Sequence, residues 1–177
     1  MPEIRIDTSE LTYSWFWIPG HLPHFVDGSV PGGAAVDLDP GEYPFQQTRD
    51  RPCDVGFRVA LDGTVDFDAE YDHLLRGRGT STLHVVGVPV TLHPTGSPGP
   101  LLPMWGGCRE PITSREHTVR MPPGTAYAIR LGLVSSAVLE FSVAADGRVD
   151  YSSEYERALS GRGTKRLTVD LDTLGRR

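Results

Sequence analysis

An internal repeat constrains this chain more than any other feature of its sequence. Residues 57–85 (FRVALDGTVDFDAEYDHLLRGRGTSTLHV) align without a gap on residues 141–169 (FSVAADGRVDYSSEYERALSGRGTKRLTV), at an offset of 84. Sixteen of the 29 paired positions carry the same amino acid. Because both copies share one order of apolar, turn and charged positions, the repeat predicts two copies of one folding unit.

The repeat divides the chain into four segments. We expect an N-terminal aromatic segment at 1–35, a first β repeat at 36–94, a linker rich in proline and glycine at 95–118, and a second β repeat at 119–174. A unit of roughly 60 residues is marginally stable alone. We therefore expect the repeats to form one body with a pseudo-twofold axis, packed through the faces that carry Phe57, Val59, Phe141 and Val143.

Within each repeat the residue pattern predicts mostly β structure. Apolar residues alternate from Val55 to Leu61, Asp62-Gly63 is typical of a type I′ hairpin turn, and Thr64 to Phe67 forms the return strand. A second hairpin is expected from Thr80 to Val86 and from Val88 to Leu92, broken at Gly87.

A change of spacing after the first hairpin predicts a short helix in each repeat. Tyr71, Leu74 and Leu75 recur at helical spacing, and so do their counterparts in the second copy. Asp68 in one repeat, and Ser152 or Ser153 in the other, can cap its beginning. Gly77 and Gly161 are expected to end it.

The segment Leu38-Asp-Pro-Gly-Glu-Tyr43 resembles the turn and tyrosine found at the sheet corner of many β-sandwich domains. In those domains the tyrosine hydroxyl bonds back to the main chain. The second repeat departs from this pattern, because Tyr127 stands one residue later after its Pro-Gly pair. The fold class expected is therefore mainly β: an internally duplicated β-sandwich or barrel-like unit with a short helix in each repeat.

Composition and charge narrow the class of protein. The chain has 23 acidic against 17 basic residues and a net charge of -6, which disfavours binding to nucleic acid. No apolar run reaches the roughly 20 residues of a membrane helix, and no secretory signal is visible, so no membrane contact and a cytoplasmic location are expected. An exported mature form remains the alternative.

Two further details of composition add to this. Lys165 is the one lysine among the 17 bases, a skew typical of a GC-rich, actinobacterium-like genome. Cys53 and Cys108 are too far apart for a CxxC or zinc set, and are either free thiols or a disulfide that braces the linker.

The motif Gly-Arg-Gly-Thr occurs in both repeats, at 77–80 and at 161–164. Each arginine could clamp a carboxylate or phosphate ligand. The structural interpretation is favoured, because every member of the set is duplicated. It pairs Arg78 with Asp66 or Glu70, and Arg162 with Asp150 or Glu154, as internal ion pairs. No cofactor is expected.

Metal binding and catalysis find weak support in the sequence. The acids from Asp62 to Asp72 resemble a calcium ladder but lack the glycine and glutamate positions of an EF-hand. His21 and His24 form a close pair without a third ligand, so no metal site is expected. Neither a nucleophile elbow nor a cysteine signature occurs, so no catalytic residue is assigned and an enzyme is disfavoured.

The segments outside the repeat are the candidate binding site. Trp17, His21, His24, Trp105 and Arg109 have no counterpart in the other repeat, and we expect them to gather on one side of the molecule. Loops on a rigid scaffold often carry binding residues, and tryptophan suits a sugar or an apolar protein surface.

The sequence thus predicts a non-catalytic binding protein with a protein or glycan partner. The alternative is a small enzyme or ligand-binding β-barrel with a pocket between the repeats. Charge adds one asymmetry: residues 36–94 hold ten acids and five arginines, whereas residues 119–174 hold seven acids and seven bases. An acidic face of this kind suits a basic partner.

Overall fold

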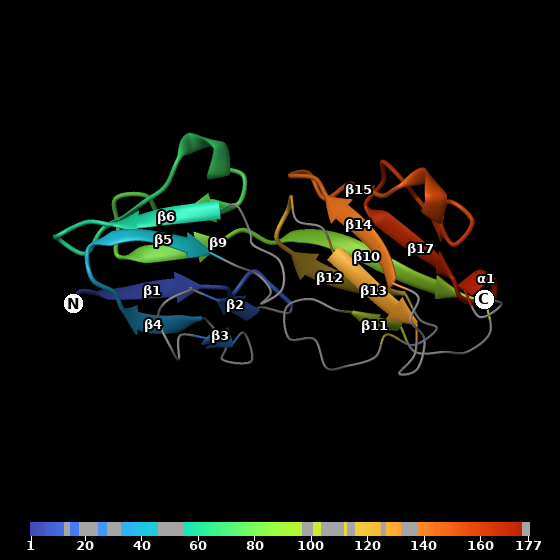
Figure 1. The fold of residues 1–177 in the computed structure, drawn as a ribbon, viewed down its shortest axis with the longest axis horizontal. Helices are drawn as coiled ribbons and strands as arrows, with labels where there is room; N and C mark the ends of the chain where they lie inside the picture. The colour runs from blue at the N-terminus through green and yellow to red at the C-terminus, as the bar shows by residue number, and fades with distance from the viewer. Residues whose placement is uncertain are drawn as a thin grey trace.

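A computed structural model describes residues 1–12, 15–17, 25–27, 33–45, 55–96, 101–103, 112, 116–124, 127–131 and 138–174. The chain is mainly β, in several sheets, and no closed barrel forms among the described strands. Figure 1 shows two lobes lying end to end along the longest axis of the molecule. None of the described helices is long and apolar enough to cross a membrane.

The first lobe has two sheets, formed by described segments between residues 1 and 86. Its elements are β1 (Glu3–Asp7), β4 (Ala34–Asp37), β5 (Gly41–Phe45), β6 (Val55–Val59), β7 (Val65–Asp66), the 3-10 turn η1 (Ala69–Tyr71), β8 (Leu75–Arg76) and β9 (Thr82–Val85). One sheet has the order β4-β1-β9-β8 and the other β5-β6-β7. β1 runs antiparallel to β4 and parallel to β9.

The second lobe, residues 88–174, has a matching arrangement. Its elements are β10 (Val88–Thr95), β11 (Leu101–Pro103), β12 (His117–Met121), β13 (Tyr127–Leu131), β14 (Val138–Val143), β15 (Val149–Asp150), the 3-10 turn η2 (Ser153–Tyr155), β16 (Leu159–Ser160), β17 (Arg166–Asp170) and α1 (Leu171–Leu174). The sheets have the orders β12-β10-β17-β16 and β11-β13-β14-β15. β10 runs antiparallel to β12 and parallel to β17.

A further pair of short strands belongs to neither arrangement. β2 (Trp15–Trp17) and β3 (Phe25–Asp27) form a two-stranded antiparallel sheet.

Equivalent strands of the two lobes run in the same direction along the molecule. In Figure 1 the arrows of β1 and β10 both point away from the N-terminal end, and those of β4 and β12 both point toward it. The lobes therefore follow each other head to tail.

Each lobe has its own buried core. Phe57 and Val59 belong to the core of the first lobe, and Phe141 and Val143 to that of the second. The prediction that the repeats pack through these four residues is therefore wrong. Each sheet instead buries its apolar face within its own lobe, because the strands that cover it come from the same half of the chain.

The predicted hairpin around Gly87 is also wrong, because this segment connects the two lobes. Thr80–Val86 and Val88–Leu92 do not form a hairpin: β9 pairs with β1 and β8, whereas β10 pairs with β12 and β17. Gly87 is the connection, and a Cβ there would lie 2.5 Å from the carbonyl oxygen of Glu10. A glycine is required because the chain crosses here in close contact with the first lobe.

The strand pairing groups the elements differently from the segments expected from the sequence. β1 lies within the expected N-terminal segment 1–35, yet it pairs with β4 and β9 of the first repeat. β10 lies largely within the expected first repeat 36–94, yet it is central to the second lobe. Each lobe thus begins one strand earlier than the sequence repeat.

The hairpin turn at Asp62-Gly63 is present but is not type I′. Gly63 has a φ of 80°, whereas no described residue other than glycine has a positive φ. The Gly63 N–H bonds to Ala60 and the Ala60 N–H to Thr64, so the loop is three residues long. A type I turn followed by a left-handed glycine gives this geometry, and Gly147 repeats it.

The expected short helices are single 3-10 turns. Ser152 caps η2 by accepting the Glu154 N–H at 3.4 Å, but Asp68 makes no side-chain cap bond in η1. The Asp68 carboxylate binds Arg58 instead.

The tyrosine corner is present in both lobes. The hydroxyl of Tyr43 donates to the carbonyl of Asp39, and that of Tyr127 to the carbonyl of Pro122. The second loop is one residue longer between carbonyl and tyrosine, which accounts for the shift in the sequence. Both rings then contact the phenylalanine across the strand pair, Phe57 at 5.5 Å and Phe141 at 5.6 Å between centroids.

Candidate functional site

The Gly-Arg-Gly-Thr loops connect β8 to β9 and β16 to β17, and their main chains are held from within. The Thr80 hydroxyl bonds to the Gly77 carbonyl at 2.8 Å and accepts the Thr82 N–H at 3.1 Å. Thr164 makes the same two contacts, at 2.7 and 3.2 Å, with Gly161 and Arg166. The threonine thus closes the loop on itself.

The first glycine of each loop cannot be replaced without collision. Gly77 has a φ of 102°, and a Cβ there would lie 2.0 Å from the Thr82 carbonyl oxygen. Gly161 has a φ of 101° and the same clearance to Arg166. These glycines are needed for the fold, because the main chain of the next strand lies too close for a side chain.

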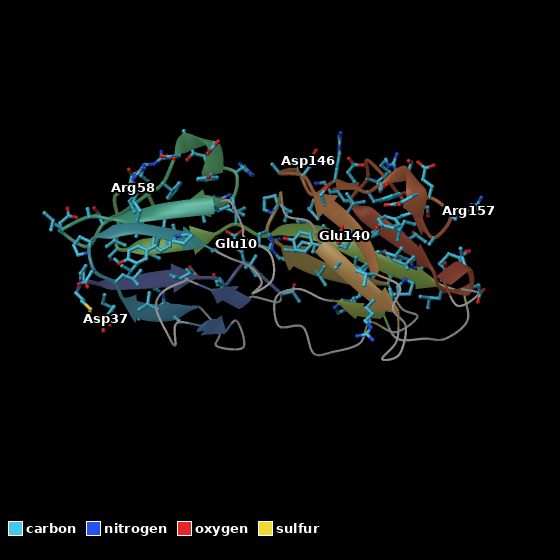
Figure 2. The ribbon with its side chains drawn as sticks, in the orientation of Figure 1. Glu10, Asp37, Arg58, Glu140, Asp146 and Arg157 are labelled. Carbon is cyan, nitrogen blue, oxygen red and sulfur yellow. The ribbon has the colours of Figure 1, made fainter. Side chains whose placement is uncertain are left out.

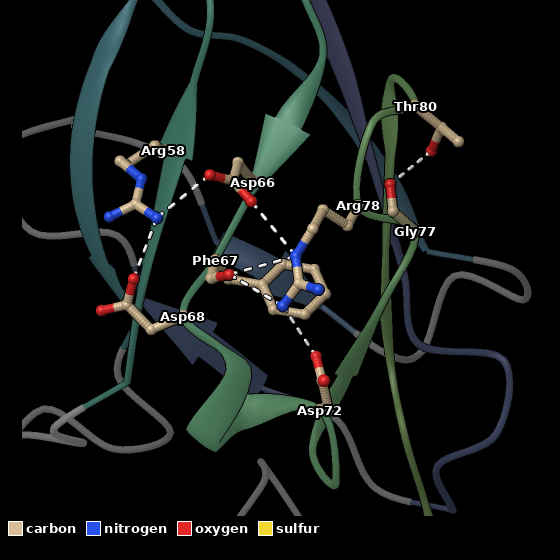
Figure 3. Close-up of polar contacts among 8 residues, drawn as sticks. All are labelled: Arg58, Asp66, Phe67, Asp68, Asp72, Gly77, Arg78 and Thr80. Carbon is tan, nitrogen blue, oxygen red and sulfur yellow. Dashed lines mark hydrogen bonds and ion pairs between the residues drawn. The ribbon is translucent and has the colours of Figure 1, made fainter.

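Arg78 joins three parts of the first lobe (Figure 3). Its Nε lies 3.2 Å from Asp66 Oδ1, its Nη2 lies 2.8 Å from Asp72 Oδ1, and the guanidinium also donates to the Phe67 carbonyl at 2.9 Å. The guanidinium carbon lies 4.7 Å from the centroid of the Phe67 ring. Arg78 therefore fixes the β8–β9 loop to β7 and to the segment after η1.

Arg162 repeats these contacts in the second lobe. It lies 3.4 Å from Asp150 and 3.0 Å from Glu156, and it donates to the Tyr151 carbonyl at 2.6 Å. Its guanidinium lies over the Tyr151 ring at 4.8 Å. Two equivalent arginines with equivalent partners are the signature of a fold-holding interaction.

Two features of the predicted ion pairs differ from the structure. The second carboxylates are Asp72 and Glu156, one residue beyond the 3-10 turns. Glu70 and Glu154 lie within the turns and, among the described contacts, do not pair with these arginines. The arginines are also not internal, because their side chains are 44% and 39% exposed. The spacing of charges along the sequence does not show which carboxylate faces the arginine, because this depends on where the 3-10 turn ends. The predicted pairs with Glu70 and Glu154 are therefore wrong.

The network is larger in the first lobe than in the second. Arg58 Nη2 lies 3.0 Å from Asp66 and 2.9 Å from Asp68, so Asp66 bridges Arg58 and Arg78 (Figure 3). In the second lobe Ser142 and Ser152 stand at the positions of Arg58 and Asp68. The hydrogen bond from Arg58 lowers the pKa of Asp66, and the bond to Asp68 raises the pKa of Arg58.

A shallow groove of about 320 Å³ lies over this network, on the outer face of β5, β6 and β7. Its lining residues are Gly41, Glu42, Arg58, Val59, Ala60 and Asp66. The groove is within the first lobe, and the pocket between the repeats that the sequence offered as an alternative stays a prediction.

A histidine–carboxylate pair lies on the sheet of the first lobe. His84 Nδ1 lies 2.9 Å from Asp7 Oδ2, across the parallel pair of β1 and β9. Burial raises the pKa of Asp7, but hydrogen bonds from Ser9 and His84 outweigh it and the pKa is lowered overall. Sequence reasoning missed this pair, because 77 residues separate its members.

No group of three metal-binding side chains lies within the part of the chain that the structure describes. Four acids of the segment that resembled a calcium ladder, Asp62, Asp66, Asp68 and Asp72, engage other groups. Asp62 accepts the Thr64 N–H and hydroxyl, and Asp66, Asp68 and Asp72 bind the two arginines.

The predicted aromatic binding site falls mainly outside the described residues. Trp17 lies at the end of β2, and its side chain is not described. His21, His24, Trp105 and Arg109, and also Cys53 and Cys108, lie outside the described ranges. Their gathering on one side therefore stays a prediction.

Comparison with known proteins gives no relative: no protein family, curated protein or solved structure matches this chain.

Proposed function

We propose that the chain is a non-catalytic binding protein that recognises a protein or glycan partner through its non-repeated loops. The scaffold would be two copies of one β-sandwich unit, arising by internal duplication and stacked head to tail rather than about the pseudo-twofold axis expected from the sequence. The equivalent strand orders and registers of the two lobes support this part of the proposal.

One observation carries the functional part. The side chains that the repeats share make matching contacts within their own lobes: tyrosine on phenylalanine, threonine on its loop, and arginine on an aspartate and an aromatic ring. These shared polar residues are therefore accounted for by the fold. Residues without a counterpart, Trp105 and Arg109 among them, lie outside the described residues, and their binding role is the proposal itself.

Tryptophan-bearing loops on a rigid β scaffold fit a binding role. Loops tolerate sequence change without loss of the core, and an indole offers a large rigid surface to a sugar ring or to an apolar protein side chain. The interaction would rest on a few such anchors rather than on the whole surface.

Two experiments test this proposal. In the first, the immobilised protein captures partners from lysate and culture medium of the source organism; in the second, the protein is applied to a glycan array. Support would be a partner that binds purified chain at a fixed stoichiometry by calorimetry and is recovered chemically unchanged. A partner that is converted to a product would contradict a non-catalytic role.

A further inference from the structure

The two lobes meet where a segment of the first lobe lies on the outer edge of β12. The Thr12 N–H donates to the Arg120 carbonyl at 3.0 Å, and the Arg120 N–H donates to the Thr12 hydroxyl at 2.8 Å. The Arg120 guanidinium lies 3.5 Å from the Glu10 carboxylate and donates to the Glu10 carbonyl at 2.9 Å. A segment that carries Glu10 is thus docked on the edge of β12 at Arg120, and its chain turns at Ser9 and Glu10, where the Leu11 N–H bonds to the Thr8 carbonyl at 2.9 Å.

The strand register assigns Asp37 of β4 to the position that Arg120 occupies in β12. Asp37 pairs with Glu3 near the beginning of β1, and Arg120 pairs with Pro89 near the beginning of β10. The Leu38 N–H points inward, to the Pro2 carbonyl at 3.1 Å. Because successive residues of a strand alternate, the Asp37 N–H and C=O point outward, as those of Arg120 do.

The charge at this position is reversed between the lobes and is not neutralised in the first. Glu3 and Asp37 stand directly opposite each other and are exposed, and neither forms an ion pair with a residue that the structure describes. Like charges at opposed positions destabilise a sheet. By contrast, Asp66, Asp68 and Asp72 in the same lobe are bound by arginines.

Exposed apolar side chains lie at the same end of the lobe. Leu61, in the β6–β7 turn, is 90% exposed, and Met1 is 79% exposed. The turn lies against the beginning of β1, since a Cβ on Gly63 would be 2.9 Å from Pro2. Figure 2 shows Asp37 at this free end, with Glu10 toward the junction of the lobes.

We propose that the outer edge of β4 at Asp37 docks a segment of another protein that places a cation beside Asp37, in the manner of the Thr12 segment on Arg120. Main-chain bonds to Asp37 would give the affinity, and a cation facing Asp37 and Glu3 would give the specificity. A second copy of this chain does not suit the position, because its own docking segment carries Glu10. The proposal does not depend on the role of the tryptophan loops.

A peptide with the charge reversed at position 10 tests the proposal. The probe copies residues 6–14 (IDTSELTYS) with Glu10→Arg, and the comparison peptide has the unchanged sequence. Titrated into isotopically labelled chain, the Glu10→Arg peptide is expected to shift the amide resonances of residues 35–38, with a Kd at least about tenfold lower than that of the unchanged peptide. A Thr12→Pro version, which lacks the N–H donor, is expected to lose this binding.

The Asp37→Arg variant provides the reciprocal measurement. Because Asp37 is exposed, the variant is expected to keep the wild-type circular dichroism spectrum and to prefer the unchanged peptide over the Glu10→Arg peptide. The proposal is overturned if neither peptide shifts residues 35–38, if both bind equally, or if the Thr12→Pro version binds as well as its parent.

Discussion

Arg120 in the second lobe donates through Nε to the main-chain carbonyl of Glu10 in the first, at 2.9 Å. The Glu10 carboxylate in turn lies 3.6 Å from Arg76 and accepts the Gly87 N–H at 3.2 Å. Glu10 therefore contacts the first lobe at Arg76, the connection between the lobes at Gly87, and the second lobe at Arg120. Since each lobe has its own core, these contacts couple the unfolding of one lobe to that of the other.

Arg120→Ala is expected to separate the unfolding of the two lobes. The substitution removes charge-assisted hydrogen bonds worth about 1–3 kcal/mol in total. Differential scanning calorimetry should show one transition for the wild type and two for the variant. Arg157→Ala, at an exposed arginine far from the junction (Figure 2), is the matched control and should keep one transition.

Arg78→Ala is expected to destabilise the first lobe by about 1–2 kcal/mol, because it removes a partly exposed ion pair and a contact with the Phe67 ring. Arg162→Ala should cost a similar amount in the second lobe. Denaturant titration measures both values. A loss of 4 kcal/mol or more in either variant would require a fully buried pair.

Gly77→Ala is expected to cost at least about 3 kcal/mol, because it adds a collision with the Thr82 carbonyl to an unfavourable φ. Gly79→Ala is the matched control in the same loop. Gly79 has a φ of 78° but no atom within 4 Å of the added Cβ, so only about 1–2 kcal/mol should be lost. Equal losses in the two variants would show that the collision does not matter.

The sequence predicts the local features of each repeat better than it predicts which strands pair with each other. The repeat itself, the hairpin at Asp62-Gly63 and the contact of Arg78 with Asp66 follow from local pattern and from duplication. The pairing of β10 with β12 and β17 does not, because the alternation of apolar residues gives a strand its faces but not its neighbours. For the same reason Gly87 was expected in a hairpin and proved to join two lobes.

In the candidate site too, contacts that depend on the three-dimensional arrangement could not be predicted from the sequence. The choice of Asp72 over Glu70 depends on where a 3-10 turn ends, which spacing of charges does not reveal. The junction of Glu10 with Arg120 spans 110 residues and carries no local signal. Trp105 and the histidines were singled out by their residue type and because they lack a counterpart in the other repeat, and neither criterion gives their positions in space.

Acid is expected to destabilise the first lobe through Asp66 and Asp62. The bond from Arg58 lowers the folded-state pKa of Asp66, and the Thr64 N–H lowers that of Asp62. A lowered folded pKa stabilises the protein above the unfolded value of about 3.9, and this contribution is lost as the pH falls through the folded pKa. Denaturant titrations from pH 7 down to pH 2 should show the loss, and it should be smaller for Asp66→Asn. An unchanged pH dependence in that variant would contradict the assignment.

The central claim is that shared residues hold the fold whereas non-repeated loops bind the partner. It is tested most directly by measuring both melting temperature and partner affinity for Trp105→Ala and Arg78→Ala. The account predicts that Trp105→Ala weakens binding and leaves the melting temperature within a few degrees, whereas Arg78→Ala lowers the melting temperature and leaves binding intact. The reverse pattern, a destabilised Trp105→Ala variant that still binds and a stable Arg78→Ala variant that does not, would contradict it.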